Sequence, residues 1–270
     1  GENMGAYGVG CLDYYFGPVY YVSTSGSDSE GNGSEENPFA TIQKGIDVSI
    51  DNDTILVYDG TYSENIEINN KNIVVGSMSL IDGDTAHISS TIIYGNQVER
   101  VVTIGNIFSS TTLYGFTIEN GNGGVVVNGQ SIINNCIIRD NQSSSDGGGI
   151  YVNGSEPQII NCKILNNSAP SGGGISLLSD AIIENCIIKN NTVTLYGGGI
   201  YCNYSYPKII NSLVIDNNIV GSVNNSAGGI HTENGGSSTP ETIIINSTIY
   251  GNDEYGLRID GSILLMNNII

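Results

Sequence analysis

The feature that most constrains this chain is a short apolar block that returns every 20 to 35 residues, each time around one asparagine. It reads Ile-Ile-Asn-Asn-Cys-Ile-Ile at 132–138, Ile-Ile-Asn-Cys-Lys-Ile at 159–164 and Ile-Ile-Glu-Asn-Cys-Ile-Ile at 182–188. Apolar and variable positions alternate on both sides of the asparagine, a pattern typical of half-buried β-strands. We call the shared asparagine the anchor; the anchors are Asn135, Asn161, Asn185, Asn211, Asn246 and Asn267.

The anchor interrupts the alternation, so the chain is expected to bend there, and asparagine tolerates the left-handed backbone that such a bend needs. Stacked anchor side chains can also hydrogen-bond from one repeat to the next, so we predict a structural ladder in this column. A second motif, Gly-Gly-Gly-Ile, has its last glycine at Gly149, Gly174 and Gly199, at a constant step of 25 residues, and supplies a turn and another strand.

Each period therefore holds several short strands separated by bends, which is one coil of a solenoid. No amphipathic segment of helix length separates the strands, so a βαβ arrangement is excluded. We predict an all-β parallel solenoid of about nine or ten coils.

A short helix is predicted upstream, because Phe39, Ile42 and Ile46 have helical spacing and Thr41 can cap its first turn. This helix would cover the open end of the core. We divide the chain into residues 1–16 as the tail of a preceding module or linker, 17–52 as an N-terminal strand, polar loop and capping helix, and 53–270 as the solenoid, which stops partway through a repeat.

The opening of the chain resembles that of the pectate-lyase-like right-handed parallel β-helix superfamily. The resemblance rests on Tyr-Tyr-Val-Ser at 20–23, Asn-Pro-Phe-Ala-Thr-Ile at 37–42, Asp-Thr-Ile at 53–55 and Gly-Thr-Tyr at 60–62. The Asn-Cys and Gly-Gly-Ile repeats resemble the adhesin-like surface proteins of that superfamily, including the polymorphic outer-membrane type. The resemblance implies a right-handed β-helix and an extracellular or cell-surface location.

Charge limits the partners. The chain has 27 Asp and Glu against 8 Lys and Arg, a net charge of -19, so nucleic acid and anionic membranes are excluded as partners. No run approaches the ~20 apolar residues of a membrane span, and membrane insertion is not expected.

Candidate catalytic groups do not converge in the sequence, so we assign no catalytic residue. Glu119 and Arg139 fall in one outward column of neighbouring coils and are expected to form an exposed salt bridge. Asp140 and Asp216 share a column but lie three coils apart, too far for paired carboxylate chemistry. The two histidines of the chain, His87 and His231, are expected to be polar surface residues.

Four cysteines follow the repeat. Cys136, Cys162 and Cys186 fill one inward position directly after the anchor, and Cys202 fills an inward position after a Gly-Gly-Gly-Ile motif. We predict buried, reduced core thiols, because zinc sites usually pair cysteines at short spacing; a metal site is the alternative.

Two loops are candidate binding sites. Asp28, Glu30, Asn32 and Glu35 offer oxygen ligands for a possible Ca²⁺ ion, with a solvated loop as the alternative, and no cofactor is required. The interval between Asn211 and Asn246 is 35 residues long, and its excess would project as side loops suited to recognition. The possible binding residues there are Asn224, Asn225, Glu233 and Asn234.

Our functional hypothesis is a non-catalytic extracellular module, adhesin-like or filament-forming, of a larger modular protein. Its partners would be further copies, neighbouring modules of the same chain, glycans or surface proteins. The rival is a carbohydrate-active enzyme, a polysaccharide lyase or hydrolase, or a glycan-binding domain. In that rival, outward tyrosines would stack on sugars; the candidates are Tyr114, Tyr151, Tyr201 and Tyr250.

Overall fold

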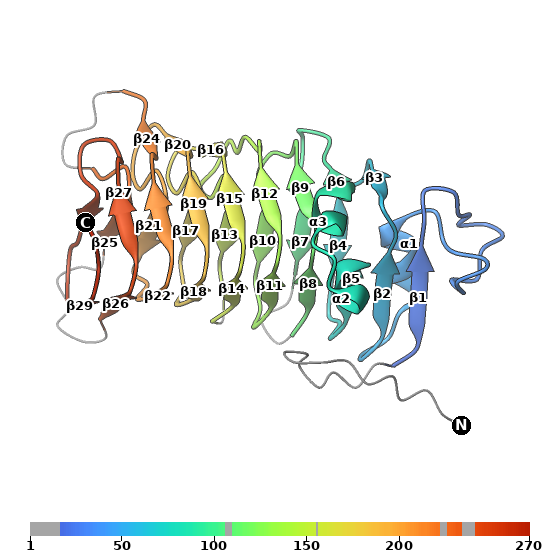
Figure 1. The fold of residues 1–270 in the computed structure, drawn as a ribbon. Helices are drawn as coiled ribbons and strands as arrows, with labels where there is room; N and C mark the ends of the chain where they lie inside the picture. Colours follow the sequence, from blue (N-terminus) through green and yellow to red (C-terminus); the bar gives the residue numbers. More distant parts are fainter. Residues whose placement is uncertain (1–16, 106–109, 155, 222–225, 234–240) are drawn as a thin grey trace.

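The chain forms a parallel β-helix in which short strands stack coil upon coil along one axis (Figure 1). The computed structural model describes residues 17–105, 110–154, 156–221, 226–233 and 241–270. Within these residues, every strand pairing is parallel, and the strands form sheets of 10, 8, 8 and 3 strands, here named A, B, C and D. A coil runs from sheet A through B and C and back to A. The predicted all-β right-handed solenoid is confirmed.

The strands are two to four residues long. Sheet A contains β1 (Val19–Val22), β2 (Thr54–Val57), β5 (Val74–Ser77), β8 (Thr112–Tyr114), β11 (Ile132–Asn134), β14 (Gln158–Ile160), β18 (Ile182–Glu184), β22 (Lys208–Ile210), β26 (Thr242–Ile245) and β29 (Ile263–Met266). Sheet B contains β3 (Gly60–Tyr62), β6 (Thr91–Tyr94), β9 (Thr117–Glu119), β12 (Ile137–Arg139), β15 (Lys163–Leu165), β19 (Ile187–Lys189), β23 (Leu213–Ile215) and β27 (Thr248–Tyr250). Sheet C contains β4 (Ile66–Ile68), β7 (Val102–Ile104), β10 (Val125–Val127), β13 (Ile150–Val152), β17 (Ile175–Leu177), β21 (Ile200–Asn203), β25 (Ile230–Glu233) and β28 (Leu257–Arg258). Sheet D contains β16 (Ser168–Ala169), β20 (Thr192–Val193) and β24 (Asn218–Ile219).

The repeat alignment gives the register of the coils. Ile133 pairs with Ile159, and Ile159 pairs with Ile183, as the anchor spacing requires. These isoleucines are fully buried, and they belong to one core that runs through the whole solenoid. Because each coil places Ile or Val at the same inward positions, neighbouring coils bury each other's apolar side chains, which no single coil could do alone.

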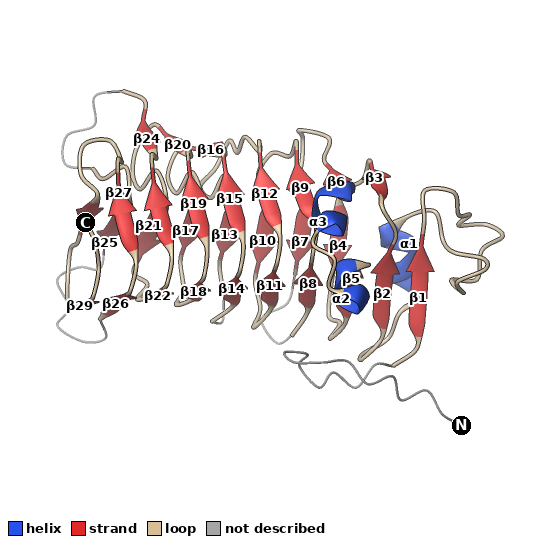
Figure 2. Cartoon of the chain, in the orientation of Figure 1, coloured by secondary structure: helices blue, strands red, loops and turns tan. Residues whose placement is uncertain are grey.

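A short helix closes the N-terminal end of the core, as predicted. Helix α1 (Ile42–Val48) begins after Thr41, whose hydroxyl accepts a hydrogen bond from the Lys44 backbone N–H. Phe39, Ile42 and Ile46 are buried against the first strands. Two further short helices, α2 (Ser79–Asp82) and α3 (Ala86–Ser90), lie outside sheets A and B (Figure 2). None of the helices among the described residues has the length and apolar run that a membrane crossing requires.

The anchors bend the chain between sheets A and B. All six have a positive φ of 50° to 54°, and Gly115 takes the same place one coil earlier with a φ of 79°. The anchors do not form the continuous ladder that was predicted. Asn161 donates to Asn134, and Asn135 donates to Tyr114, so neither bonds to another anchor. Among the described anchors, one hydrogen bond joins two anchors, from Asn267 Nδ2 to Asn246 Oδ1. The anchors stack in register, as expected. Among the described anchors the hydrogen-bonded ladder is limited to that last pair, because the anchor side chains point outward, where water competes for their hydrogen bonds.

The hydrogen-bonded ladder lies in a second column, six residues after each anchor, at the corner between sheets B and C. The Asn167 backbone N–H and side-chain amide both donate to Asn191 Oδ1, at 2.9 and 3.1 Å. The Asn191 amide donates in turn to Ile164 O and to Asn217 Oδ1, each at 3.0 Å. The ladder is Asn141, Asn167, Asn191, Asn217 and Asn252.

Candidate functional site

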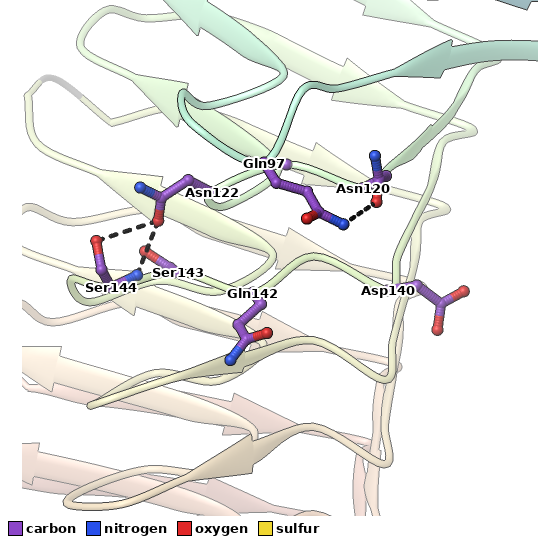
Figure 3. A pocket seen from close by; sticks show the side chains of 8 residues that line it. Gln97, Asn120, Asn122, Asp140, Gln142, Ser143 and Ser144 are labelled. Atoms are coloured by element: carbon purple, nitrogen blue, oxygen red, sulfur yellow. Dashed lines mark hydrogen bonds between the residues drawn. The ribbon is translucent and has the colours of Figure 1, made fainter.

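A polar trough runs along the corner between sheets B and C. Its centre is a depression of about 340 Å³ that we call the amide trough (Figure 3). It forms where three successive coils turn out of β6, β9 and β12. Carboxamide and hydroxyl side chains line it, with Asp140 at its edge; the lining side chains are Gln97, Asn120, Asn122, Gln142, Ser143 and Ser144.

The local sequence builds the trough by ending each sheet B strand in a left-handed residue. Gln97, Asn120 and Asp140 have φ values of 62°, 63° and 55°, a conformation that Asn and Asp adopt more readily than other non-glycine residues. After Asn120 and Asp140 the next residue turns inward: Gly121 is buried, and Asn141 joins the buried ladder. In these two coils the polar side chains that follow, Asn122 and Gln142, are left on the surface.

Hydrogen bonds hold part of the trough in place. Gln97 Nε2 donates to Asn120 Oδ1 at 2.6 Å, and the Asn122 carboxamide accepts from the Ser144 backbone N–H at 2.8 Å (Figure 3). The Gln142 side chain is exposed and makes no hydrogen bond within the described part of the chain. Donors and acceptors therefore remain available along the trough.

Two neighbouring depressions extend the trough along the axis. One, of about 320 Å³, shares Asn122 and is lined by Asn65, Glu67 and Glu99. The other, of about 330 Å³, shares Gln142 and Ser143 and continues over apolar side chains of sheet D, among them Ala169, Pro170 and Val193. The result is a continuous surface that is polar at one end and apolar at the other.

A half-buried arginine lines the depression that shares Asn122 with the trough. The Arg100 guanidinium donates to the carbonyls of Asp146 and Gly147 and stacks over the Tyr151 ring at 5.5 Å. Burial lowers the pKa of Arg100 to about 10, so it stays charged at neutral pH. Its two terminal nitrogens donate to protein oxygens, so Arg100 braces the wall of that depression.

Arg139 forms ion pairs with two carboxylates at the edge of the trough. Arg139 Nε lies 2.8 Å from Glu119 Oε2 and 3.7 Å from Asp140 Oδ2, so the expected Glu119–Arg139 salt bridge is present. Lys189 lies 3.2 Å from Asp216, which is distant from Asp140 along the axis. The structure therefore brings one acid–base trio to the trough edge, and it keeps Asp140 and Asp216 apart.

The candidate Ca²⁺ loop has a structural task. Asp28 caps the start of α1, because its carboxylate accepts from the Ala40 and Thr41 backbone N–H groups and from the Thr41 hydroxyl. Asn32 accepts from the Ser34 N–H, and Glu35 accepts from Tyr58 at 3.4 Å. Among the described residues, Glu30 included, no group of three or more His, Cys, Asp or Glu side chains is placed to hold a metal ion.

One of the two histidines, His231, differs from expectation. His231 is fully buried, not on the surface: its ring lies 4.8 Å from that of Tyr196, and its Nε2 accepts from Arg258 at 3.0 Å. Burial and Arg258 lower the pKa of His231 to about 4. His87 is only partly exposed and lies between two carboxylates, 2.5 Å from Asp59 and 3.0 Å from Asp82, which raise its pKa.

The remaining predicted positions are spread over the solenoid. The four cysteines are buried and free. The tyrosines proposed for sugar stacking form no common platform, because Tyr114 lies on sheet A, Tyr151 and Tyr201 on sheet C, and Tyr250 on sheet B. Tyr201 is also buried and donates to Glu233 at 2.6 Å. Residues 1–16 and the loop positions Asn224, Asn225 and Asn234 lie outside the described residues.

The sequence analysis missed the amide trough and the true ladder. Their signal was present: the corner pairs Asp140-Asn141, Asn166-Asn167, Asn190-Asn191 and Asp216-Asn217 recur five and six residues after the anchors. Asparagine in the second place of every pair distinguishes a buried, hydrogen-bonded position from a variable surface one.

Comparisons with known proteins agree with this geometry. Residues 53–242 match the family model described as a right handed beta helix region, whereas no curated protein matches the chain. Among solved structures, pectate lyase Pel9A has a TM-score of 0.62 at 16% identity, over 95% of this chain and 71% of that chain. Pectin methylesterase PemA from Erwinia chrysanthemi has a TM-score of 0.54 at 16% identity, over 93% and 88%. Such low identities establish the fold alone. The family model spans most of the chain, and the protein therefore belongs to the right-handed β-helix family.

Proposed function

We propose that this chain is a non-catalytic extracellular surface module that binds an uncharged polysaccharide lengthwise in the amide trough. The carrying observation is the continuity of the trough. The amide trough shares Asn122 with one neighbouring depression and Gln142 and Ser143 with the other, so the three follow the solenoid axis over several coils. A polymer lying along this axis would meet polar side chains at one end and apolar side chains at the other. The surface suits an extended ligand better than a small, enclosed one.

The chemistry of the lining favours sugar hydroxyls. A carboxamide offers two donors and an acceptor, and a serine hydroxyl can donate and accept, so both match hydroxyl groups that do the same. The exposed Val220 beside sheet D would contact the apolar faces of sugar rings. Glu67, Glu99 and Asp140 border the trough and its neighbouring depression against one lining cation, Arg100, and the chain carries a net charge of -19. A polyanion would therefore be repelled.

The experiment is a binding titration with a variant that removes exposed polar side chains from the trough and leaves the buried asparagine ladder unchanged. In the Gln97→Ala/Gln142→Ala variant, two exposed carboxamides are lost. The matched control is Gln158→Ala, which removes an exposed glutamine from sheet A. Titrations with a panel of uncharged glucans and mannans, and with polygalacturonate, should give binding to at least one uncharged polymer, loss in the double variant and retention in the control. Preferred binding of polygalacturonate, or unchanged binding by the double variant, would contradict the proposal.

A second candidate, a polysaccharide lyase or hydrolase, is favoured by the trio at the trough edge. Glu119 and Asp140 flank Arg139, so carboxylates and a cation adjoin the proposed binding surface. Glycoside hydrolysis uses two carboxylates, and elimination uses a base beside an acidified proton. Release of reducing ends or unsaturated products, measured with and without Ca²⁺, distinguishes this candidate: product formation abolished by Glu119→Gln or Asp140→Asn supports it.

A further inference from the structure

Helices α2 and α3 form an insert, residues 79–90, that lies on the outward faces of sheets A and B (Figure 2). Strand β5 ends at Ser77 and β6 begins at Thr91, whereas later coils join the same two sheets through an anchor and one further residue. Leu80 packs on Gly76 of β5, where an added β-carbon would meet the Leu80 side chain at 2.9 Å. The insert therefore covers outward sheet positions that later coils leave partly exposed.

Few hydrogen bonds attach the insert to the solenoid. Within the described part of the chain, two such bonds join residues 80–90 to elements outside the insert. The Thr117 hydroxyl of β9 donates to Ile88 O at 2.8 Å, and His87 Nδ1 lies 2.5 Å from Asp59 Oδ1. A segment with so few attachments opens locally at a lower free energy than the core does. One of the two attachments depends on a titratable side chain, that of His87.

His87 joins two carboxylates from different parts of the chain. Its Nδ1 faces Asp59, in the turn between β2 and β3, and its Nε2 lies 3.0 Å from Asp82 Oδ2, at the end of α2. Only the protonated ring carries a hydrogen on both nitrogens, so only the imidazolium can donate to both carboxylates. In the neutral ring, one nitrogen lone pair faces a carboxylate oxygen, and one of the two hydrogen bonds is lost.

The charges that face the His87 ring are those of Asp59 and Asp82. Among the described residues, neither carboxylate forms an ion pair with a Lys or Arg. Asp84, the other acid of the insert, accepts from a backbone N–H at the start of α3. Strands β5 and β6 beneath the insert carry no charged residue, and Glu119 of β9 is paired with an arginine. Every charge that faces the ring therefore favours its protonated form.

Proton binding to His87 is consequently coupled to docking of the insert. The two carboxylates, Asp59 foremost, raise the pKa of His87. Because these contacts exist only while the insert is docked, protons favour the docked state over the open one. This stabilisation is present at low pH and is lost as the pH rises through the docked-state pKa.

The insert also forms one wall of a cavity. Thr85, Ile88 and Ser89 line this cavity of about 380 Å³ from the insert, and Ile137 and Lys163 line it from sheet B. Opening of the insert would remove the α3 wall and would uncover Thr117, which is 1% exposed while the insert is docked. The position of the insert therefore decides whether this part of sheet B is accessible.

We propose that protonation of His87 controls whether the α2–α3 insert is docked on sheets A and B. With the ring protonated, both carboxylates hold the insert in place and the cavity keeps its α3 wall. With the ring neutral, residues 79–90 open more often while the coils beneath them stay folded. The insert is thus a lid that closes in acid and loosens as the pH rises.

The test is hydrogen–deuterium exchange of the folded chain at several pH values between about 5.5 and 8. Exchange rates are corrected for the intrinsic pH dependence of amide exchange, and helix α1 serves as the internal reference. Carboxylates ordinarily ionise below this range, so histidine is the side chain that titrates within it. Protection of residues 79–90 relative to α1 should fall by on the order of fivefold as the pH rises, the effect expected of two partly exposed ion pairs.

The decisive variant is His87→Gln, whose side chain is neutral at every pH, so that the insert should show low protection with no pH dependence. The matched control is His231→Gln, which removes the other histidine and should keep the pH dependence of the wild type. An NMR titration of the His87 ring gives an independent readout, because its pKa should be lower in Asp59→Asn than in the wild type. A pH dependence that persists in His87→Gln, equal protection of the wild-type insert across the range, or an unchanged His87 pKa in Asp59→Asn would overturn the proposal.

Discussion

Replacing one asparagine of the buried ladder should cost far more stability than replacing an anchor. Asn191→Ala removes four hydrogen bonds: two from Asn167 to its Oδ1, and one each from its amide to Ile164 O and Asn217 Oδ1. The Asn167 N–H, one Asn167 amide hydrogen and the Ile164 carbonyl then lose these hydrogen bonds in a fully buried place. At about 1–3 kcal/mol for each unsatisfied buried group, and with partial rescue by water, we expect a loss of about 3–5 kcal/mol.

Asn185→Ala is the matched comparison, because Asn185 is an exposed anchor whose main task is its left-handed backbone at a φ of 54°. Forcing alanine into that conformation costs about 1 kcal/mol. Asn185→Gly should cost nothing measurable, because glycine adopts this conformation freely.

Equilibrium unfolding in guanidinium chloride, followed by far-ultraviolet circular dichroism, measures both variants on the same scale. The account predicts a clearly lower midpoint for Asn191→Ala than for Asn185→Ala. Equal midpoints would refute the reasoning, because they would mean that the buried ladder contributes no more than a surface bend.

Four further predictions concern titratable and charged side chains. The pKa of His231 is lowered to about 4 in the folded chain, so the unfolded chain binds more protons than the folded chain below pH 6.5. The wild type therefore loses stability as the pH falls from 6.5 to 5. His231→Gln removes this contribution, and its free energy of unfolding should fall by on the order of 1 kcal/mol less over the same pH range. The pKa of His87 is raised, so its protonated form stabilises the folded chain at low pH, and this contribution is lost as the pH rises. His87→Gln should therefore lower the stability at pH 5 and have less effect at higher pH. Denaturant unfolding measured at several pH values checks both histidine predictions. Arg100→Lys should lower stability by roughly 2–3 kcal/mol, since lysine cannot reproduce the forked bonds to two carbonyls, and thermal melts showing no change would contradict this. Glu119→Gln should change stability by less than about 1 kcal/mol in the same melts, because its partner Arg139 is well exposed, and a larger loss would reveal a tighter pair.

The architecture could be predicted because each coil repeats the same inward apolar positions and the same bends. An inward isoleucine at Ile133 implies one at Ile159, and the register follows from aligning them. The capping helix was also predictable, since Phe39, Ile42 and Ile46 have an apolar spacing that only a helix brings to one face. Helices α2 and α3 were missed because four or five residues are too few for a periodic signal.

The site could be predicted less well, because it depends on contacts that repeats do not reveal. The rings of Tyr196 and Tyr201 contact His231 and help to bury it. Tyr196 comes from a turn before the next strand of sheet C, and no local sequence pattern predicts this contact. The ladder was assigned to the wrong column because asparagine recurs in both columns. In the anchor column the asparagine itself has a positive φ, and in the ladder column the residue before it does. Which asparagine faces inward depends on where the strand of sheet B ends, and that is a tertiary property.

The central claim, that the trough receives an uncharged polymer, is tested most directly by mapping where the ligand lies. Hydrogen–deuterium exchange of the folded chain, with and without an uncharged oligosaccharide that the titration panel has identified, reports protection along the backbone. The account predicts new protection at 95–98, 120–123 and 142–145, the turns that carry the trough, with sheet A unchanged. Protection confined to sheet A, or to no part of the trough, would contradict it.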